Sequence, residues 1–181
     1  KEYRAKFEGL SIATAYIVFG LASKVLIADT LDVYVGPMRD QPDTLGVIGS
    51  LYLIFAYSFQ IYFDFYGYSL IAIGLGGLFG FHFPANFNRP YEALNPKIFW
   101  RRWHITLSYW IRDYIYMPLG GANSYRRNIL IIFALCGLWH GAGWNFIIWG
   151  LFHVALVLGY NAIRTQWDLM PAFLQRAATF I

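Results

Sequence analysis

Long apolar runs separated by short polar stretches make up most of the chain, and each sufficiently long run predicts a helix. Residues 9–28 form the first run, interrupted only by Lys24. Their length matches the roughly 20 residues that a helix needs to cross a bilayer, and Lys24 lies near the end, where its side chain can reach the membrane interface. The next stretch, DTLDVYVGPMRDQPD, contains prolines and acidic residues, which predict an exposed loop.

The second apolar region, residues 44–88, contains Asp64 as its one formally charged residue. At roughly 20 residues per span, this region is long enough for two membrane helices. We place the break between them at residues 64–69, where a glycine loosens the backbone and neighbouring tyrosines are typical of an aromatic belt. The helix that follows, residues 70–83, carries the sequence GLGG, whose small residues allow a neighbouring helix to approach closely.

Residues 82–96 are rich in proline and asparagine and predict a loop. Asn95 and Pro96 at its end predict the N-cap and the first turn of a helix. The run that follows, residues 98–119, mixes arginines and an aspartate with tryptophans. This mixture favours a helix that lies at the membrane interface or re-enters the bundle, and a polar turn at residues 120–128 ends it.

The last apolar run, residues 129–163, has a Gly-Ala-Gly break near its middle, which predicts two helices or one broken helix with His140 at the junction. Residues 128–162 contain no Lys, Arg, Asp or Glu. His140 and His153 are therefore the only side chains there that titrate near neutral pH. An imidazole at membrane depth is costly unless it pairs or faces a cavity, so His140 is the leading functional candidate.

The composition is that of a membrane protein. Of the 181 residues, 58% are hydrophobic and 13% are charged, against about 25% charged residues in soluble domains. The net charge of +4 comes from basic residues placed between apolar runs, which argues against a nucleic-acid partner. The one cysteine, Cys136, lies inside an apolar run, so neither a disulfide framework nor a cysteine metal site can form.

These patterns predict an all-α fold, a polytopic transmembrane helical bundle with a re-entrant or interfacial helix. Residues 1–181 are expected to form a single partial membrane domain with about five to six helical segments. The chain opens on KEYRAKFEGL, without an initiator Met or a signal-peptide pattern, and stops on RAATFI. We therefore expect a fragment of a longer chain, truncated at both ends.

Two histidines are the strongest candidates for chemistry. His140 can act as a base, or it can hydrogen-bond a backbone carbonyl freed by the break after it. His104 follows two arginines in the block RRWH, whose charge keeps its imidazole neutral and suits a base or a hydrogen-bond donor; a structural role at the interface is an equal alternative. The two histidines do not have i, i+4 spacing, and no metal site is predicted. The absence of a GxSxG motif argues against a serine-histidine-carboxylate triad.

The remaining polar residues have more ordinary interpretations. Asp64 is either the partner of a histidine or arginine within the bundle or an interfacial residue at a helix end. Asp113 is expected to pair with Arg112 beside it. His82 and His153 are interpreted as structural, and the tryptophans as packing and membrane-belt residues.

Three stretches of the chain carry a family resemblance. They are FQIYFDFYGYS (59–69), FWRRWHITLSYWIRDYIYMPLGG (99–121) and LWHGAGWNFIIWGLFH (138–153). Together and in this order they resemble the membrane-bound O-acyltransferase family, in particular its alginate O-acetyltransferase-like bacterial branch. The resemblance implies a polytopic enzyme whose helices enclose a tunnel, with the histidine of the WHG motif, His140, at the catalytic centre. The second histidine of the family, in the RWH motif, falls on His104.

One position departs from the family pattern. Relatives usually read GYSDMAIG where this chain reads GYSLIAIG, so Leu70 replaces an acidic residue. This departure keeps a catalytically inactive scaffold open as an alternative function. A second alternative is a transporter or channel fragment in which His140 and Asp64 relay protons.

The function implied by the resemblance is O-acetylation of hydroxyl groups on an exported bacterial polysaccharide, with His140 as general base and His104 as a donor to the developing oxyanion. Acetyl-CoA or an acyl carrier is expected as co-substrate, with no tightly bound cofactor and no metal. The expected partners are membrane lipid, the polysaccharide and extracytoplasmic acyltransferase proteins, at the bacterial inner membrane. Residues expected to bind substrate or line the cavity are Asp64, Trp100, Asp113, Trp139 and Asn145.

Overall fold

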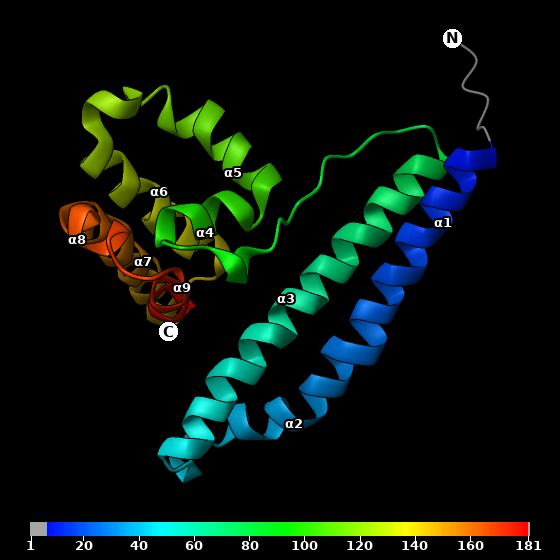
Figure 1. Ribbon diagram of the computed structural model, residues 1–181, viewed down its shortest axis with the longest axis horizontal. Helices are drawn as coiled ribbons and strands as arrows, with labels where there is room; N and C mark the ends of the chain where they lie inside the picture. The colour runs from blue at the N-terminus through cyan, green and yellow to red at the C-terminus, as the bar shows by residue number, and fades with distance from the viewer. Residues whose placement is uncertain (1–6, 181) are drawn as a thin grey trace. The chain divides into compact units, whose positions relative to one another are not determined.

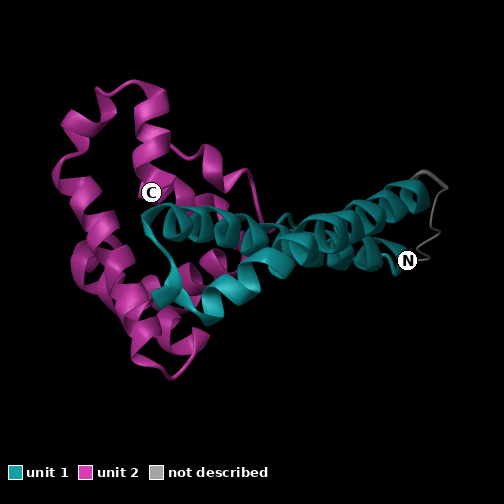
Figure 2. Ribbon diagram, turned by 90° about the horizontal axis from the view of Figure 1, so that it is seen from below, with its two compact units in different colours: residues 1–85 teal, residues 86–181 magenta. Residues whose placement is uncertain are grey.

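The computed structural model describes residues 7–180, and within that range it consists of helices and loops without a β-strand. The chain divides into two compact units, residues 1–85 and residues 86–181, which Figures 1 and 2 show in ribbon form. The all-α prediction is confirmed. The prediction of a truncated chain rests on the two chain ends. Residues 1–6 and 181 of these ends lie outside the described residues.

Unit 1 is a helical hairpin. Its first arm consists of α1 (Phe7–Leu21), the π-helical turn η1 (Ala22–Ala28) and α2 (Asp29–Asp40). The short 3₁₀ turn η2 (Pro42–Thr44) joins this arm to the second, α3 (Val47–Leu78), which runs back beside the first arm (Figure 1).

The loop predicted for residues 29–43 is wrong over most of its length, because α2 continues the first arm to Asp40. Ala28 and Val35 are seven residues apart and both are fully buried, which is the spacing of a packed helical seam. Of the acidic residues that predicted a loop, Asp29, Asp32 and Asp40 are exposed on the surface of this helix. Packing of α2 against α3 therefore overrides the local preference of this stretch.

The helix break predicted near Asp64 is also wrong, because α3 is a single helix of 32 residues. Its glycines bring helices together instead of interrupting them. A Cβ atom on Gly67 would lie 2.7 Å from the carbonyl oxygen of Gly20, and one on Gly74 would lie 2.6 Å from the carbonyl oxygen of Ala13. The predicted close approach at the GLGG sequence is thereby confirmed.

An ion-pair network crosses the hairpin near these contacts. Lys24 Nζ lies 2.6 Å from Asp64 Oδ1 and 2.7 Å from Asp29 Oδ1. Lys24 belongs to the π-helical turn η1 of the first arm, and Asp64 lies in the middle of α3. The two charges in these apolar helices therefore compensate each other, as charges within membrane helices generally must.

Unit 2 begins with a loop that contains the 3₁₀ turn η3 (Pro90–Glu92) and leads into α4 (Pro96–Arg102). Asn95 caps α4 as predicted, because its Oδ1 accepts a hydrogen bond of 2.9 Å from the backbone N–H of Ile98. The remaining segments of unit 2 are α5 (Ile105–Ile111), η4 (Arg112–Tyr116), η5 (Gly121–Ser124), α6 (Tyr125–His140), α7 (Trp144–Ala162), α8 (Arg164–Asp168) and α9 (Ala172–Phe180).

The single helix predicted over residues 98–119 is wrong, because the chain breaks between α4 and α5. His104 adopts left-handed backbone torsions, with φ of 46°, which an α-helix cannot contain. Asn86 then holds the start of α5. Its carbonyl oxygen accepts from the N–H of Ile105 at 2.9 Å, and its side-chain oxygen accepts from the hydroxyl of Thr106 at 2.9 Å.

Helices α6 and α7 form an antiparallel pair, and residues 141–143 separate them. This confirms the predicted break after His140. Close backbone contact again depends on glycine: a Cβ atom on Gly137 would collide with the carbonyl oxygen of Phe146, and one on Gly150 with that of Phe133. Buried Phe133, Val154 and Val157 form the core between these helices.

Within residues 7–180, three helical segments are long and apolar enough to cross a membrane: Gly9–Asp40, Val47–Leu78 and Trp144–Ala162. They expose large apolar side chains that a water-soluble protein would bury, among them Ile48 at 85% and Trp144 at 79% exposure. Such surfaces are compatible with contact to lipid.

We predict that Gly67→Ala destabilises the protein whereas Gly36→Ala does not. The new Cβ atom at position 67 meets backbone atoms of the first arm, which corresponds to overpacking that costs about 1–3 kcal/mol. At Gly36 the space within 4 Å is open, so alanine adds only helix propensity. The measurement is the thermal unfolding midpoint of the purified full-length protein in detergent. Equal midpoints for the two variants would contradict the packing assigned to Gly67.

Candidate active site

His140 is the last residue of α6, and aromatic rings cover it on several sides. The ring of Trp139 lies 4.9 Å away between centroids, and that of Trp149 on α7 lies 5.1 Å away. Phe146 stacks at 6.4 Å with an interplanar angle of 20°. His140 as a whole is nevertheless exposed, so the imidazole contacts these rings and remains accessible to a reactant.

Glycine after His140 permits this arrangement. A Cβ atom on Gly141 would collide with the Phe146 ring, so a side chain there would push Phe146 away from His140. The N–H of Gly141 donates to the carbonyl oxygen of Gly137 at 3.3 Å, which closes the last turn of α6. The Gly-Ala-Gly break thus serves packing as well as chain reversal.

His104 reaches the same site from the break between α4 and α5. Its ring lies 6.4 Å from that of Trp139, at an angle of 67°. Trp139 therefore contacts both histidines, although they are 36 residues apart in the sequence. Trp139, itself a predicted site residue, therefore links the two predicted site residues His104 and His140.

Both histidines lie outside the three candidate membrane spans, and their electrostatic environment favours the neutral imidazole. Burial lowers the pKa of His104, and the neighbouring His140 lowers that pKa further. Partial burial among the aromatic rings lowers the pKa of His140. Both side chains are therefore unprotonated at neutral pH and able to accept a proton.

His153 extends the aromatic cluster, although the sequence pattern suggested only a structural role for it. Its ring lies 4.6 Å from Trp149 and 4.8 Å from Trp100. Trp100, on α4, also packs edge-on against Phe133 at 5.2 Å. The spacing of four residues between Trp149 and His153 on α7 places both on one helix face. This spacing is the feature of the sequence from which the contact between the two rings could have been predicted.

Three other predicted site residues have different surroundings. Asp113 forms an ion pair with Arg112 at 2.7 Å, as predicted, and the hydrogen bond from Arg112 lowers the pKa of Asp113. Asn145 is exposed in the first turn of α7. Asp64 belongs to unit 1, where its partner is Lys24 rather than a histidine or arginine.

Leu70, which departs from the family pattern, is buried in α3 next to buried Ser69. An apolar side chain is suited to this position, because an unpaired carboxylate there would lose hydration. Among the described residues, no group of three or more His, Cys, Asp or Glu side chains is arranged to hold a metal ion.

The fold and the site define a helical membrane protein in which two neutral histidines approach each other at breaks between helices. The sequence model of the membrane-bound O-acyltransferase family matches residues 3–180, and the chain belongs to that family.

Similarity to individual proteins supports this conclusion. The chain is 47% identical over 180 residues to the peptidoglycan O-acetyltransferase of Helicobacter pylori, covering 94% of this chain and 34% of that protein. It is 48% identical over 152 residues to a probable alginate O-acetylase of Azotobacter vinelandii, covering 80% and 30% respectively. It is 36% identical over 133 residues to the teichoic acid D-alanyltransferase of Bacillus subtilis, covering 67% and 33%. The chain thus spans about a third of the length of these relatives.

We predict that the imidazoles of His104 and His140 both titrate below pH 6.5, the ordinary histidine value, because burial penalises their charged forms. Each is then neutral at pH 7 and becomes charged only as the pH falls through its lowered pKa. Nuclear magnetic resonance of histidine-labelled full-length protein in detergent, assigned with single His→Gln variants, measures both values. Titration of either ring above pH 6.5 would contradict the assigned environment.

Proposed function

We propose that the protein containing this chain is a membrane-embedded O-acyltransferase that transfers acetyl groups to hydroxyls of an exported bacterial polysaccharide. The observation that carries the proposal is the meeting of His104 and His140 at Trp139, in a chain that belongs to the O-acyltransferase family. Relatives at 47% and 48% identity are named for acetyl transfer to peptidoglycan and to alginate, and both acceptors are polysaccharides.

In the proposed reaction, the neutral imidazole of His140 accepts the proton of an acceptor hydroxyl. The hydroxyl oxygen attacks the carbonyl carbon of the acyl donor, and the carbonyl electrons move onto oxygen. Collapse of this intermediate forms the new ester, breaks the bond to the donor, and returns the proton to the leaving group. General-base catalysis of this kind contributes about 10²- to 10⁴-fold in rate.

His104 is the proposed hydrogen-bond donor to the developing oxyanion. A neutral imidazole carries one N–H, and the left-handed backbone at His104 fixes the residue at the break between α4 and α5. Half-burial beside Trp139 keeps water from competing for this donor, so that a hydrogen bond there is stronger than it would be in water. The aromatic rings that flank His140 limit the access of water to its imidazole on those sides.

The remaining components of the proposal concern molecules outside the chain. The acyl donor is acetyl-CoA or an acyl carrier that acts as a co-substrate, without a tightly bound cofactor. The acceptor is the polysaccharide, and extracytoplasmic acyltransferase proteins act with the membrane protein. The three apolar spans support a multi-pass location, which we assign to the bacterial inner membrane. Trp100, Asp113, Trp139 and Asn145 of unit 2 are the residues proposed to line the cavity or bind substrate. Asp64 of unit 1 is proposed separately as a substrate-binding residue.

We predict that His140→Ala in the full-length protein lowers polysaccharide acetylation by about 10²- to 10⁴-fold, because the general base is lost. His104→Ala should have a smaller effect if it only donates a hydrogen bond. His82→Ala is the matched control, since His82 is exposed in the loop before unit 2. The measurement is the acetyl content of the polymer made by cells, normalised to the amount of each variant in the membrane.

Near-normal acetylation in well-expressed His140→Ala cells would return His140 to a structural role. Similar losses of membrane protein and of acetylation in that variant would identify a folding defect instead, and so would also contradict the catalytic assignment.

We also predict that Gly141→Ala reduces acetylation at an unchanged protein level, because the added methyl group displaces Phe146 from its position against His140. Misplacement of a reacting group by about 1 Å can cost on the order of 10²-fold. Gly159→Ala is the control on α7, where the space around the glycine is open. Equal acetylation by the two variants would show that the position of Phe146 does not matter for the reaction.

A further inference from the structure

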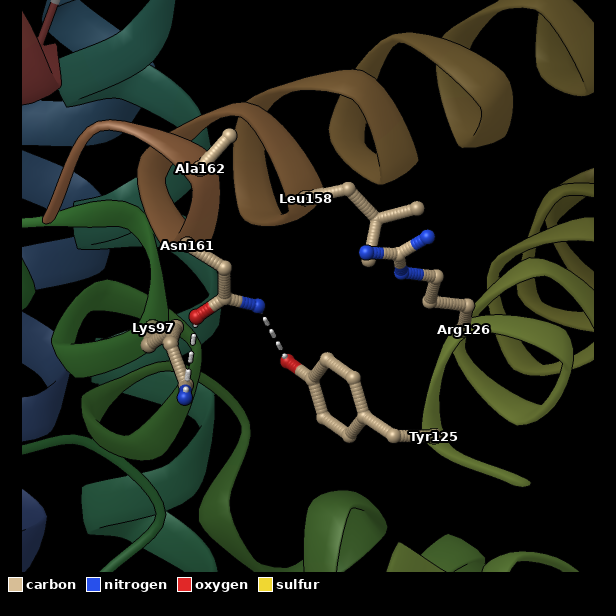
Figure 3. A pocket seen from close by; sticks show the side chains of 6 residues that line it. All are labelled: Lys97, Tyr125, Arg126, Leu158, Asn161 and Ala162. Atoms are coloured by element: carbon tan, nitrogen blue, oxygen red, sulfur yellow. Dashed lines mark hydrogen bonds between the residues drawn. The ribbon is translucent and has the colours of Figure 1, made fainter. Parts of the chain in front are cut away.

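A second polar site lies at the opposite end of α6 and α7 from His140. It is an open pocket with a volume of about 560 Å³. Figure 3 shows its lining, to which α4, α6 and α7 contribute: Lys97, Tyr125, Arg126, Leu158, Asn161 and Ala162. All six residues belong to unit 2, and the proposed acyl transfer uses none of them.

A chain of hydrogen bonds organises the polar wall of this pocket. The Lys97 ammonium donates to Asn161 Oδ1 at 3.2 Å, and Asn161 Nδ2 donates to the Tyr125 hydroxyl at 3.1 Å (Figure 3). The ammonium also lies 5.4 Å from the centre of the Tyr125 ring, a cation–π contact. These contacts hold Lys97 in place with neutral partners, so its positive charge is left available.

The surroundings of Lys97 add positive charge. Burial lowers the pKa of Lys97, and the nearby Arg101 and Arg164 lower it further. Arg164 is paired with Asp168 at 3.2 Å. Within residues 7–180, no carboxylate forms a salt bridge with Lys97, Arg101 or Arg126. The pocket is therefore a cationic site whose positive charge is not neutralised by a carboxylate of residues 7–180.

Position and lining indicate the class of anion. The last turn of α7, a candidate membrane span that ends at Ala162, forms one wall. The pocket therefore lies where that span reaches the membrane surface, the depth of lipid phosphates. Leu158 and Ala162 supply an apolar surface beside the cations, which suits a ligand that carries a phosphate on an apolar body.

We propose that this pocket binds the phosphate of an anionic phospholipid headgroup, with Lys97 and Arg126 as its charged contacts and Asn161 and Tyr125 as polar ones. Basic pockets between membrane helices are known to hold such headgroups. The proposal is independent of the acyltransferase activity, because it concerns binding at the other end of the helix pair. A free phosphate would satisfy the same cations but would make no use of the apolar wall.

Native mass spectrometry of the purified full-length protein tests this proposal, with phosphatidylglycerol or phosphatidylcholine supplied in neutral detergent. We expect preferential retention of phosphatidylglycerol. Lys97→Gln and Arg126→Gln should each weaken that binding about fivefold, and Lys97→Arg should preserve it. Arg176→Gln is the charge-matched control, because Arg176 is exposed on α9 and does not line the pocket; it should leave binding unchanged.

Several results would overturn the proposal. Equal retention of the two lipids by the unaltered protein would overturn the proposal, and this result does not depend on whether any variant folds. An equal loss of phosphatidylglycerol in Arg176→Gln would show that binding follows overall charge and not this pocket. Displacement of phosphatidylglycerol by an equal concentration of inorganic phosphate would identify a free phosphate, and not a lipid, as the ligand.

Discussion

Close contact between helix backbones is the constraint on which both halves of this structure depend. In a membrane, helices gain little from burying apolar side chains against each other, because lipid is equally apolar, so small residues that allow close packing become decisive. Gly67 and Gly74 provide this contact in unit 1, and Gly137 and Gly150 provide it in unit 2. The second pair of contacts sets α6 against α7 and thereby places Trp149 beside His140.

Both histidines of the candidate site lie where a helix is interrupted. His140 ends α6, and His104 precedes α5 with left-handed torsions. The interruptions therefore serve a purpose that continuous helices cannot: they bring two imidazoles from distant parts of the chain to the same tryptophan.

The two ends of the α6–α7 pair differ in chemistry. At the end that carries His140, the turn at residues 141–143 has no charged residue and aromatic rings flank the imidazole, an environment that favours its neutral form. At the other end, Lys97 and Arg126 line one pocket and Arg164 lies near Lys97, an environment that attracts anions. A single helical hairpin thus carries an uncharged histidine site at one end, for which we propose proton transfer, and a cationic pocket at the other.

The sequence by itself determined the features that depend on local composition: the membrane class, the all-α fold, the cap at Asn95, the break after His140 and the family. Only the tertiary structure decided the features that depend on a partner helix. Residues 29–40 are helical because their apolar side packs on α3, and Gly67 continues α3 because α1 fills the space beside it. The left-handed turn at His104, its meeting with His140 at Trp139 and the place of His153 in the same cluster depend on segments far apart in the chain. No local pattern of residues encodes such contacts, because they arise only when the helices pack.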